Sequence, residues 1–127
     1  MLLYIDMQCL ARLNQAGFIK PCQGGGPSPY DFYDYNGNEW SLGGQLTNES
    51  TVLAPQEVYK QGTRLPTITD LMNWLEIEGF VFSITYNGNG YRVIAQDESG
   101  KKYKGKGGTL PYALTSIIEK LLLNRKA

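Results

Sequence analysis

The sequence contains no histidine among its 127 residues and only two cysteines, Cys9 and Cys22. Without histidine, Ser–His and Cys–His nucleophilic pairs are excluded, and so is the most frequent general base near neutral pH. Two cysteines without histidine cannot complete a structural zinc site within one chain. Phosphate-binding loops of the G-x-x-x-x-G-K-[ST] type are also absent. We therefore expect a protein that is not an enzyme and that uses no cofactor or metal ion.

Long apolar runs are missing as well. No stretch approaches the roughly 20 residues that a membrane span requires. Asp6 interrupts the apolar N-terminal run, and no basic region precedes that run. We expect neither a membrane span nor a secretory signal, and we place the protein in the cytoplasm. Thiols stay reduced there, so Cys9 and Cys22 are expected as free thiols, with a Cys9–Cys22 disulfide as the alternative.

The composition that is present is that of one globular domain, residues 1–127, with 42% hydrophobic and 19% charged residues. The net charge is zero, but the two parts of the chain differ in sign. Residues 1–79 carry four basic and nine acidic residues, a net charge of −5, whereas residues 80–127 carry eight and three, a net charge of +5. This asymmetry favours either head-to-tail association of copies or a basic face for an acidic partner.

Two stretches of the sequence resemble each other. Residues 10–18 end in Gly-Phe and lead to Tyr-Asn-Gly-Asn at 35–38, and residues 71–80 end in Gly-Phe and lead to the same four residues at 86–89. Glycine after a helix supplies the left-handed position that ends it, and Asn-Gly between strands predicts a type I′ turn. The pattern indicates two αββ half-repeats, 1–45 and 67–106, followed by a C-terminal helix over 109–124.

The predicted fold class is α+β, in which a largely antiparallel sheet of two β-hairpin units packs with about three helices. Asp6, Thr67 and Thr109 are the predicted N-caps of the helices, and Asp70 stands where a capping box needs its acid. The segment 53–59 is either a strand or a single helical turn. The predicted strands are 30–35, 38–42, 80–86, 91–97 and 101–106, the last of them an edge strand protected by its lysines.

Aromatic and acidic residues gather in the first predicted hairpin, and such a mixture is typical of a protein-recognition surface for a basic target. The alternative is that alternate side chains of these strands point into the core. The candidate protein-binding residues are Tyr30, Asp31, Tyr33, Asp34, Tyr35 and Trp40.

A second candidate surface combines basic residues with tyrosines near the end of the second predicted hairpin. Lysine and arginine neutralise phosphates, and tyrosine stacks on bases, as in proteins that bind single-stranded nucleic acid. An edge strand kept soluble by lysine is the alternative explanation. The candidate residues are Arg92, Lys101, Lys102, Tyr103 and Lys104, with Tyr91 and Lys106 beside them.

Four segments also carry a family resemblance: the helix end at 16–18, Pro-Cys at 21–22, and residues 65–75 and 108–114. They resemble small proteins of bacteriophages and mobile elements of gut bacteria, and the C-terminal part resembles small α/β sandwich modules of phage genomes. The resemblance implies a phage-type accessory protein in the cytoplasm of a host cell.

Our main hypothesis from the sequence is therefore a non-enzymatic protein that binds a host protein. Its most specific form is an inhibitor of a bacterial immune effector. The alternatives are a single-stranded nucleic-acid or nucleotide binding protein, and a self-assembling structural component that forms homo-oligomers through the opposed charges of its two parts.

Overall fold

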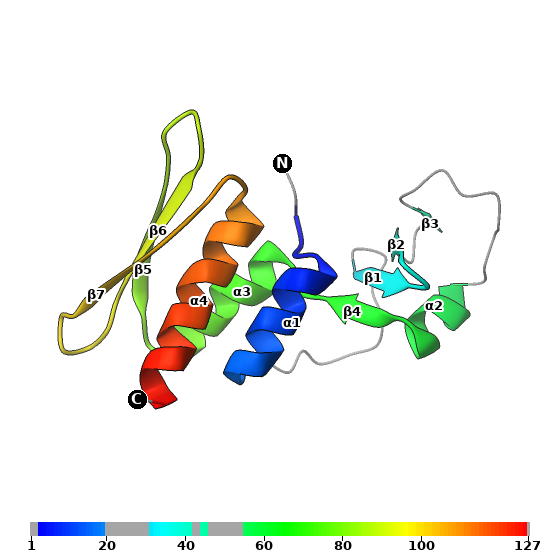
Figure 1. The fold of residues 1–127 in the computed structure, drawn as a ribbon, viewed down its shortest axis with the longest axis horizontal. Helices are drawn as coiled ribbons and strands as arrows, with labels where there is room; N and C mark the ends of the chain where they lie inside the picture. Colours follow the sequence, from blue (N-terminus) through cyan, green and yellow to red (C-terminus); the bar gives the residue numbers. More distant parts are fainter. Residues whose placement is uncertain (1–2, 20–30, 42–43, 46–54, 127) are drawn as a thin grey trace. The chain divides into compact units, whose positions relative to one another are not determined.

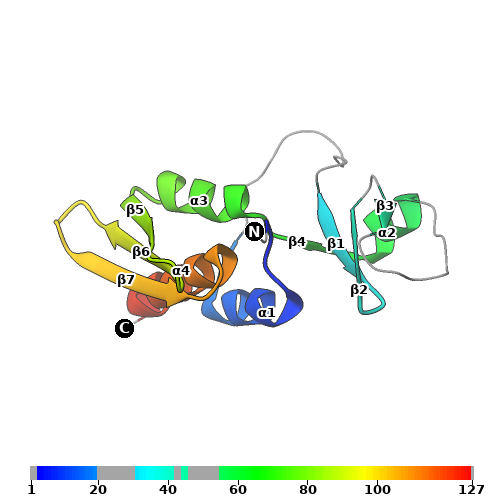
Figure 2. The same cartoon turned by 90° about the horizontal axis from the view of Figure 1, so that it is seen from above.

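The computed structural model describes residues 3–19, 31–41, 44–45 and 55–126, and the chain divides into two compact units (Figures 1 and 2). The first unit contains residues 1–21 and 66–127, and the second contains residues 22–65. Both combine helices with antiparallel strands, which confirms the α+β class. The described residues form two separate sheets and four helices, where we expected about three helices. The predicted half-repeat 1–45 is divided between the two units.

The first unit is a three-stranded sheet with helices on one side (Figure 1). Its strands pair in the antiparallel order β5-β6-β7, so β7 is an edge strand as predicted. Helix α4 lies against β6 and β7, and helices α1 and α3 pack against α4. The elements are α1 (Met7–Ala16), α3 (Ile68–Ile77), β5 (Val81–Tyr86), β6 (Tyr91–Gln96), β7 (Lys102–Gly107) and α4 (Leu110–Lys126).

The helices of the first unit begin at the predicted caps. The Asp6 carboxylate accepts a hydrogen bond of 2.8 Å from the backbone N–H of Cys9. Thr67 and Asp70 form a complete capping box, in which each side chain accepts from the other residue's backbone N–H. The hydroxyl of Thr109 accepts from the N–H of Tyr112 at the start of α4. These bonds satisfy donors that the first turn of a helix leaves unpaired.

Helices α1 and α3, which are both followed by Gly-Phe, end with the same backbone motif. Gly17 and Gly79 adopt φ values of 99° and 87°, a region that side chains with a Cβ rarely enter. The N–H of Phe18 donates to the carbonyl of Leu13, and the N–H of Phe80 donates to that of Leu75 in the same way. This is the hydrogen-bond pattern of the Schellman motif. The repeated sequence pattern thus encodes a real repeated local structure.

The phenylalanines of both Gly-Phe segments pack against one tryptophan in the first unit. The ring centroids of Phe18 and Phe80 lie 6.1 Å and 6.3 Å from that of Trp74, which is buried in α3. The guanidinium of Arg125 lies 5.4 Å from the same ring and pairs with the carboxylate of Glu78. Aromatic contacts of this kind add to the free energy of burial, so Trp74 joins the ends of α1, α3 and α4.

The two Asn-Gly hairpins differ from each other. In the second unit Asn36 and Gly37 have φ values of 52° and 81° between paired Tyr35 and Asn38, which confirms the predicted type I′ turn. In the first unit the residues 87–90 separate paired strands, and of these only Gly88 has a positive φ. The type I′ prediction was wrong there. The amide oxygen of Asn87 accepts from the N–H groups of residues 89 and 90 and stabilises a longer loop.

Close contact between α4 and the sheet fixes which sheet face is covered. Leu114, Ile117 and Ile118 are fully buried, as is Val93 on the facing side of β6. A Cβ on Gly105 would lie 2.7 Å from the backbone nitrogen of Ile117, closer than real atoms approach. The absence of a side chain at this position of β7 therefore lets the helix approach the sheet.

The second unit contains β1 (Phe32–Tyr35), β2 (Asn38–Ser41), β3 (Gly44–Gln45), β4 (Thr63–Leu65) and helix α2 (Pro55–Gln61), with strand order β3-β2-β1-β4. Strand β4 was not predicted. The undecided segment 53–59 is helical from residue 55 onward, and its first two residues lie outside the described part of the chain. Tyr33 and Trp40, which face each other across the hairpin, form a buried cluster with Val58.

Candidate functional site

The sheet of the first unit has one face turned away from α4, which we call the outer face. Side chains alternate between the two faces of a strand, so every second residue of β5, β6 and β7 belongs to it. None of the described helices of the first unit lies over this face (Figure 1). Four of its nine residues are basic and none is acidic. The nine residues of the outer face are Val81, Ser83, Thr85, Arg92, Ile94, Gln96, Lys102, Lys104 and Lys106.

The four cations of the outer face form a connected basic strip. Successive lysines along β7 are about 6.6 Å apart, since a strand rises about 3.3 Å per residue. Arg92 of β6 stands opposite Lys106 in the strand register. All four side chains are exposed, and no ion pair within the described part of the chain involves them. Their charge is therefore directed at solvent.

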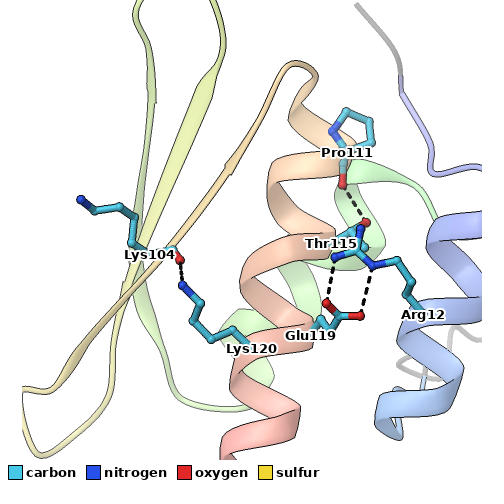
Figure 3. Close-up of polar contacts among 6 residues, drawn as sticks. All are labelled: Arg12, Lys104, Pro111, Thr115, Glu119 and Lys120. Atoms are coloured by element: carbon cyan, nitrogen blue, oxygen red, sulfur yellow. Dashed lines mark hydrogen bonds and ion pairs between the residues drawn. The ribbon is translucent and has the colours of Figure 1, made fainter.

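Figure 3 shows how the edge strand is attached to α4 without using its lysine side chains. The ammonium group of Lys120 on α4 donates a hydrogen bond to the backbone carbonyl of Lys104. The side chain of Lys104 extends to the opposite side of the strand, away from α4. The strand is thus held from one side while its ammonium groups remain available on the other.

Figure 3 also shows the polar contacts that hold α1 against α4. The guanidinium of Arg12 donates two hydrogen bonds, of 2.8 and 3.1 Å, to the carboxylate of Glu119. This pair lowers the pKa of Glu119 below its ordinary value. The buried hydroxyl of Thr115 donates to the carbonyl of Pro111 one turn earlier. Both contacts belong to the helical layer, on the side of α4 away from the outer face.

The structure brings together only part of the predicted nucleic-acid site. Arg92, Lys102 and Lys104 share the outer face, but Tyr103 lies on the covered face. Its ring packs edge-on against Phe80 at 6.5 Å, and its hydroxyl accepts a hydrogen bond from Asn124. Tyr103 therefore does not offer a stacking surface beside the lysines.

Lys101 also lies apart from the outer face, in the turn before β7. Its ammonium nitrogen is 5.2 Å from the centre of the Tyr103 ring. Asp97 organises this turn, because its carboxylate accepts from the hydroxyl and N–H of Ser99 and from the N–H of Lys101. The hydroxyl bond is the main reason that the pKa of Asp97 is lowered. The carboxylate of Asp97 thus accepts its hydrogen bonds from Ser99 and Lys101 within its own turn.

A hollow of about 450 Å³, the tip hollow, lies where the β5–β6 loop and the end of β7 meet. Two cations of the outer face, Arg92 and Lys106, line it, and no acidic residue does. The remaining lining residues are Thr85, Asn87, Asn89, Gly90, Tyr91, Gly107 and Gly108. Sequence reasoning did not identify this hollow. The only local signal for it was the glycine and asparagine content of the segments 87–90 and 107–108.

Among the described residues of the predicted protein-binding hairpin, the aromatic side chains do not form an exposed patch. Tyr33 and Trp40 are 3% and 6% exposed, which agrees with the alternative that these side chains point into the core. Burial raises the pKa of Tyr33 to about 12. The carboxylate of Asp31 pairs with Arg64 at 2.8 Å, and the hydroxyl of Tyr35 donates to Gln61.

Of the two further candidate residues of this hairpin, only one lies in the described part of the chain. Asp34 is half-buried, and Tyr30 lies outside the described residues. The hairpin therefore contributes to the interior of the second unit, and its buried side chains Tyr33 and Trp40 are not available to a partner.

The remaining predictions concern thiols, metals and membranes. Cys9 is a buried free thiol whose pKa is raised mainly by burial, and Cys22 lies outside the described residues. Within the described ranges, no cluster of three or more acidic or cysteine side chains is suited to hold a metal ion. None of the described helices has the length and apolar character needed to cross a membrane.

Comparisons of the chain with protein-family models, with curated proteins and with solved structures found no match.

Proposed function

We propose that the first unit binds single-stranded nucleic acid through the outer face of its sheet. One observation carries the proposal: four exposed cations and no acid share one sheet face of a chain whose net charge is zero. Lysine and arginine that face solvent without carboxylate partners bind phosphates by releasing the counterions of the nucleic acid. Arg92, Lys102, Lys104 and Lys106 contact the phosphates in this proposal.

The arrangement of the cations favours an extended strand. The three lysines of β7 form a straight row with a regular repeat, so each can meet a successive phosphate of a strand that runs along β7. Ile94, at the centre of the face, offers apolar contact to sugars and bases. These contacts read no base edge, so the binding is independent of sequence.

Two further tyrosines lie near the tip of the sheet but not on the outer face. Strand alternation places Tyr86 and Tyr91, whose rings lie 4.8 Å apart, on the face opposite the lysines, as it places Tyr103. Neither ring stacks bases beside the basic strip, so the preference for a single strand over duplex rests on the extended row of lysines along β7.

The salt dependence of binding tests the proposal. Anisotropy of a labelled single-stranded oligonucleotide should report binding that weakens as salt rises. The slope of log K against log salt should be about −2.8, since each of four phosphate contacts contributes roughly −0.7 on single strands. Lys102→Gln and Lys104→Gln should each reduce the steepness by about 0.7. Duplex of the same length should compete less well than unlabelled single strand.

Lys60→Gln is the matched control, because Lys60 is an exposed lysine of α2 in the second unit. It removes the same charge from the chain but none from the outer face, so the slope should not change. Absence of binding at low salt would contradict the proposal. So would a slope that Lys60→Gln reduces as much as the outer-face substitutions do.

A further inference from the structure

We infer that the tip hollow binds the terminal phosphate monoester of the nucleic-acid strand. The inference rests on the proposed function, because it assigns an end of the bound strand to one end of the outer face. It adds a ligand class that the outer face alone does not specify, namely a strand that carries a phosphate at its terminus.

The charge pattern of the sheet singles out this position. In the strand register Lys102 stands opposite Gln96 and Lys104 stands opposite Ile94, but Lys106 stands opposite Arg92. Like charges directly opposite each other destabilise a sheet unless an anion lies between them. Among the described residues that line the hollow, none is acidic. A bound ligand can therefore supply the anion that would balance the two cations.

The charge of a phosphate monoester matches this pair better than that of an internal phosphodiester. A monoester carries about −1.5 to −2 at neutral pH, because its second pKa is about 6. An internal phosphodiester carries one negative charge. Two cations on adjacent strands can each form a charge-assisted hydrogen bond with the doubly charged group, whereas along the rest of β7 each phosphate meets one lysine.

The shape of the hollow also fits the end of a strand. It lies at the end of the sheet, where the β5–β6 loop closes one side and residues 107–108 form the other. The loop is held in place by the bonds that Asn87 accepts from its backbone. A Cβ on Gly90 would lie 2.9 Å from the carbonyl oxygen of Gly107, so a side chain there would crowd the junction of the two strands. Asn89 adds an amide, a neutral hydrogen-bond donor.

Three oligonucleotides of one sequence test the inference: one with a 5′-phosphate, one with a 3′-phosphate and one with hydroxyl groups at both ends. With the full chain at fixed low salt in a buffer without phosphate, one of the two phosphorylated strands should bind about five to ten times more tightly than the hydroxyl strand. A gain of that size is typical of one additional charge-assisted contact.

Arg92→Gln and Lys106→Gln should each abolish this preference. Lys102→Gln is the matched control, since it removes one positive charge from the same strand about 13 Å from Lys106. It should weaken all three oligonucleotides by the same factor and preserve the ratio between them. Circular dichroism and the melting temperature should match those of the wild type in all three variants, because the substituted side chains are exposed.

The outcomes separate the inference from the proposed function. Salt-dependent binding that is equal for all three oligonucleotides would overturn the inference and leave the proposed function standing. A preference that survives in both Arg92→Gln and Lys106→Gln would overturn the assignment to the tip hollow. Failure of every oligonucleotide to bind at low salt would overturn both.

Discussion

A single methyl group added at Gly105 should separate α4 from the sheet of the first unit. The Cβ of Gly105→Ala would lie 2.7 Å and 2.8 Å from the backbone nitrogen and the Cβ of Ile117, and 2.9 Å from the carbonyl oxygen of Ala113. Two of these three atoms belong to the helix backbone, which cannot rotate away as a flexible side chain would. The helix must therefore move as a whole, or the strand must bend.

The expected cost follows from this geometry. Extra atoms forced into a well-packed interface usually cost about 1–3 kcal/mol in the free energy of unfolding. The upper half of that range applies here because Ile117 and Ala113 are fully buried and the contacts are with backbone. Since about 1 kcal/mol shifts the melting temperature of a small domain by roughly 4–8 °C, we expect a decrease of about 8–24 °C.

Gly108→Ala is the matched control. A Cβ at Gly108 meets no atom within 4 Å, and Gly108, like Gly105, lies outside the positive-φ region. Replacing a glycine at such a position should change stability by less than about 1 kcal/mol, and in the stabilising direction, through the entropy of the unfolded chain. Urea unfolding should be followed by Trp74 fluorescence in a Trp40→Phe background, so that only the first unit reports. Equal unfolding midpoints for the two variants would refute the close approach of α4 to β7.

Two further predictions concern the helical layer and the second unit. The pKa of Glu119 is lowered by Arg12, so the pair stabilises the fold above the ordinary glutamate pKa, and this contribution is lost as the pH falls through the lowered pKa. Glu119→Gln should therefore lower the free energy of unfolding by about 0.5–1 kcal/mol near neutral pH and by progressively less in acid, as chemical unfolding at several pH values would show. A loss of stability that stays the same at every pH would contradict this explanation. Trp40→Ala should lower the free energy of unfolding of the second unit by about 3–5 kcal/mol, because Trp40 fills a buried cluster with Tyr33. Trp40→Phe should lower it much less. A dispersed NMR spectrum of the second unit in Trp40→Ala would show that Trp40 is not needed there.

The sequence by itself determined where α1 and α3 of the first unit begin and end. Asp6 and Thr67 begin helices, and Gly17 and Gly79 end them, because each makes its contacts within a few residues along the chain. The sequence likewise predicted the strand over 80–86, which the structure has as β5 from Val81 to Tyr86. Such features need no knowledge of the rest of the molecule, since their hydrogen bonds are closed locally.

Only the tertiary structure decided which of two faces becomes surface. The strand register places Tyr33 opposite Trp40 in the first hairpin, but whether that side is buried depends on Val58, which is distant in sequence. The same uncertainty applied to Tyr103, which the covering helix α4 turns into an inner residue while Lys104 beside it stays outside. A strand has two equivalent sides, and the element that packs on one of them determines which is exposed. The basic outer face and the tip hollow follow from that packing.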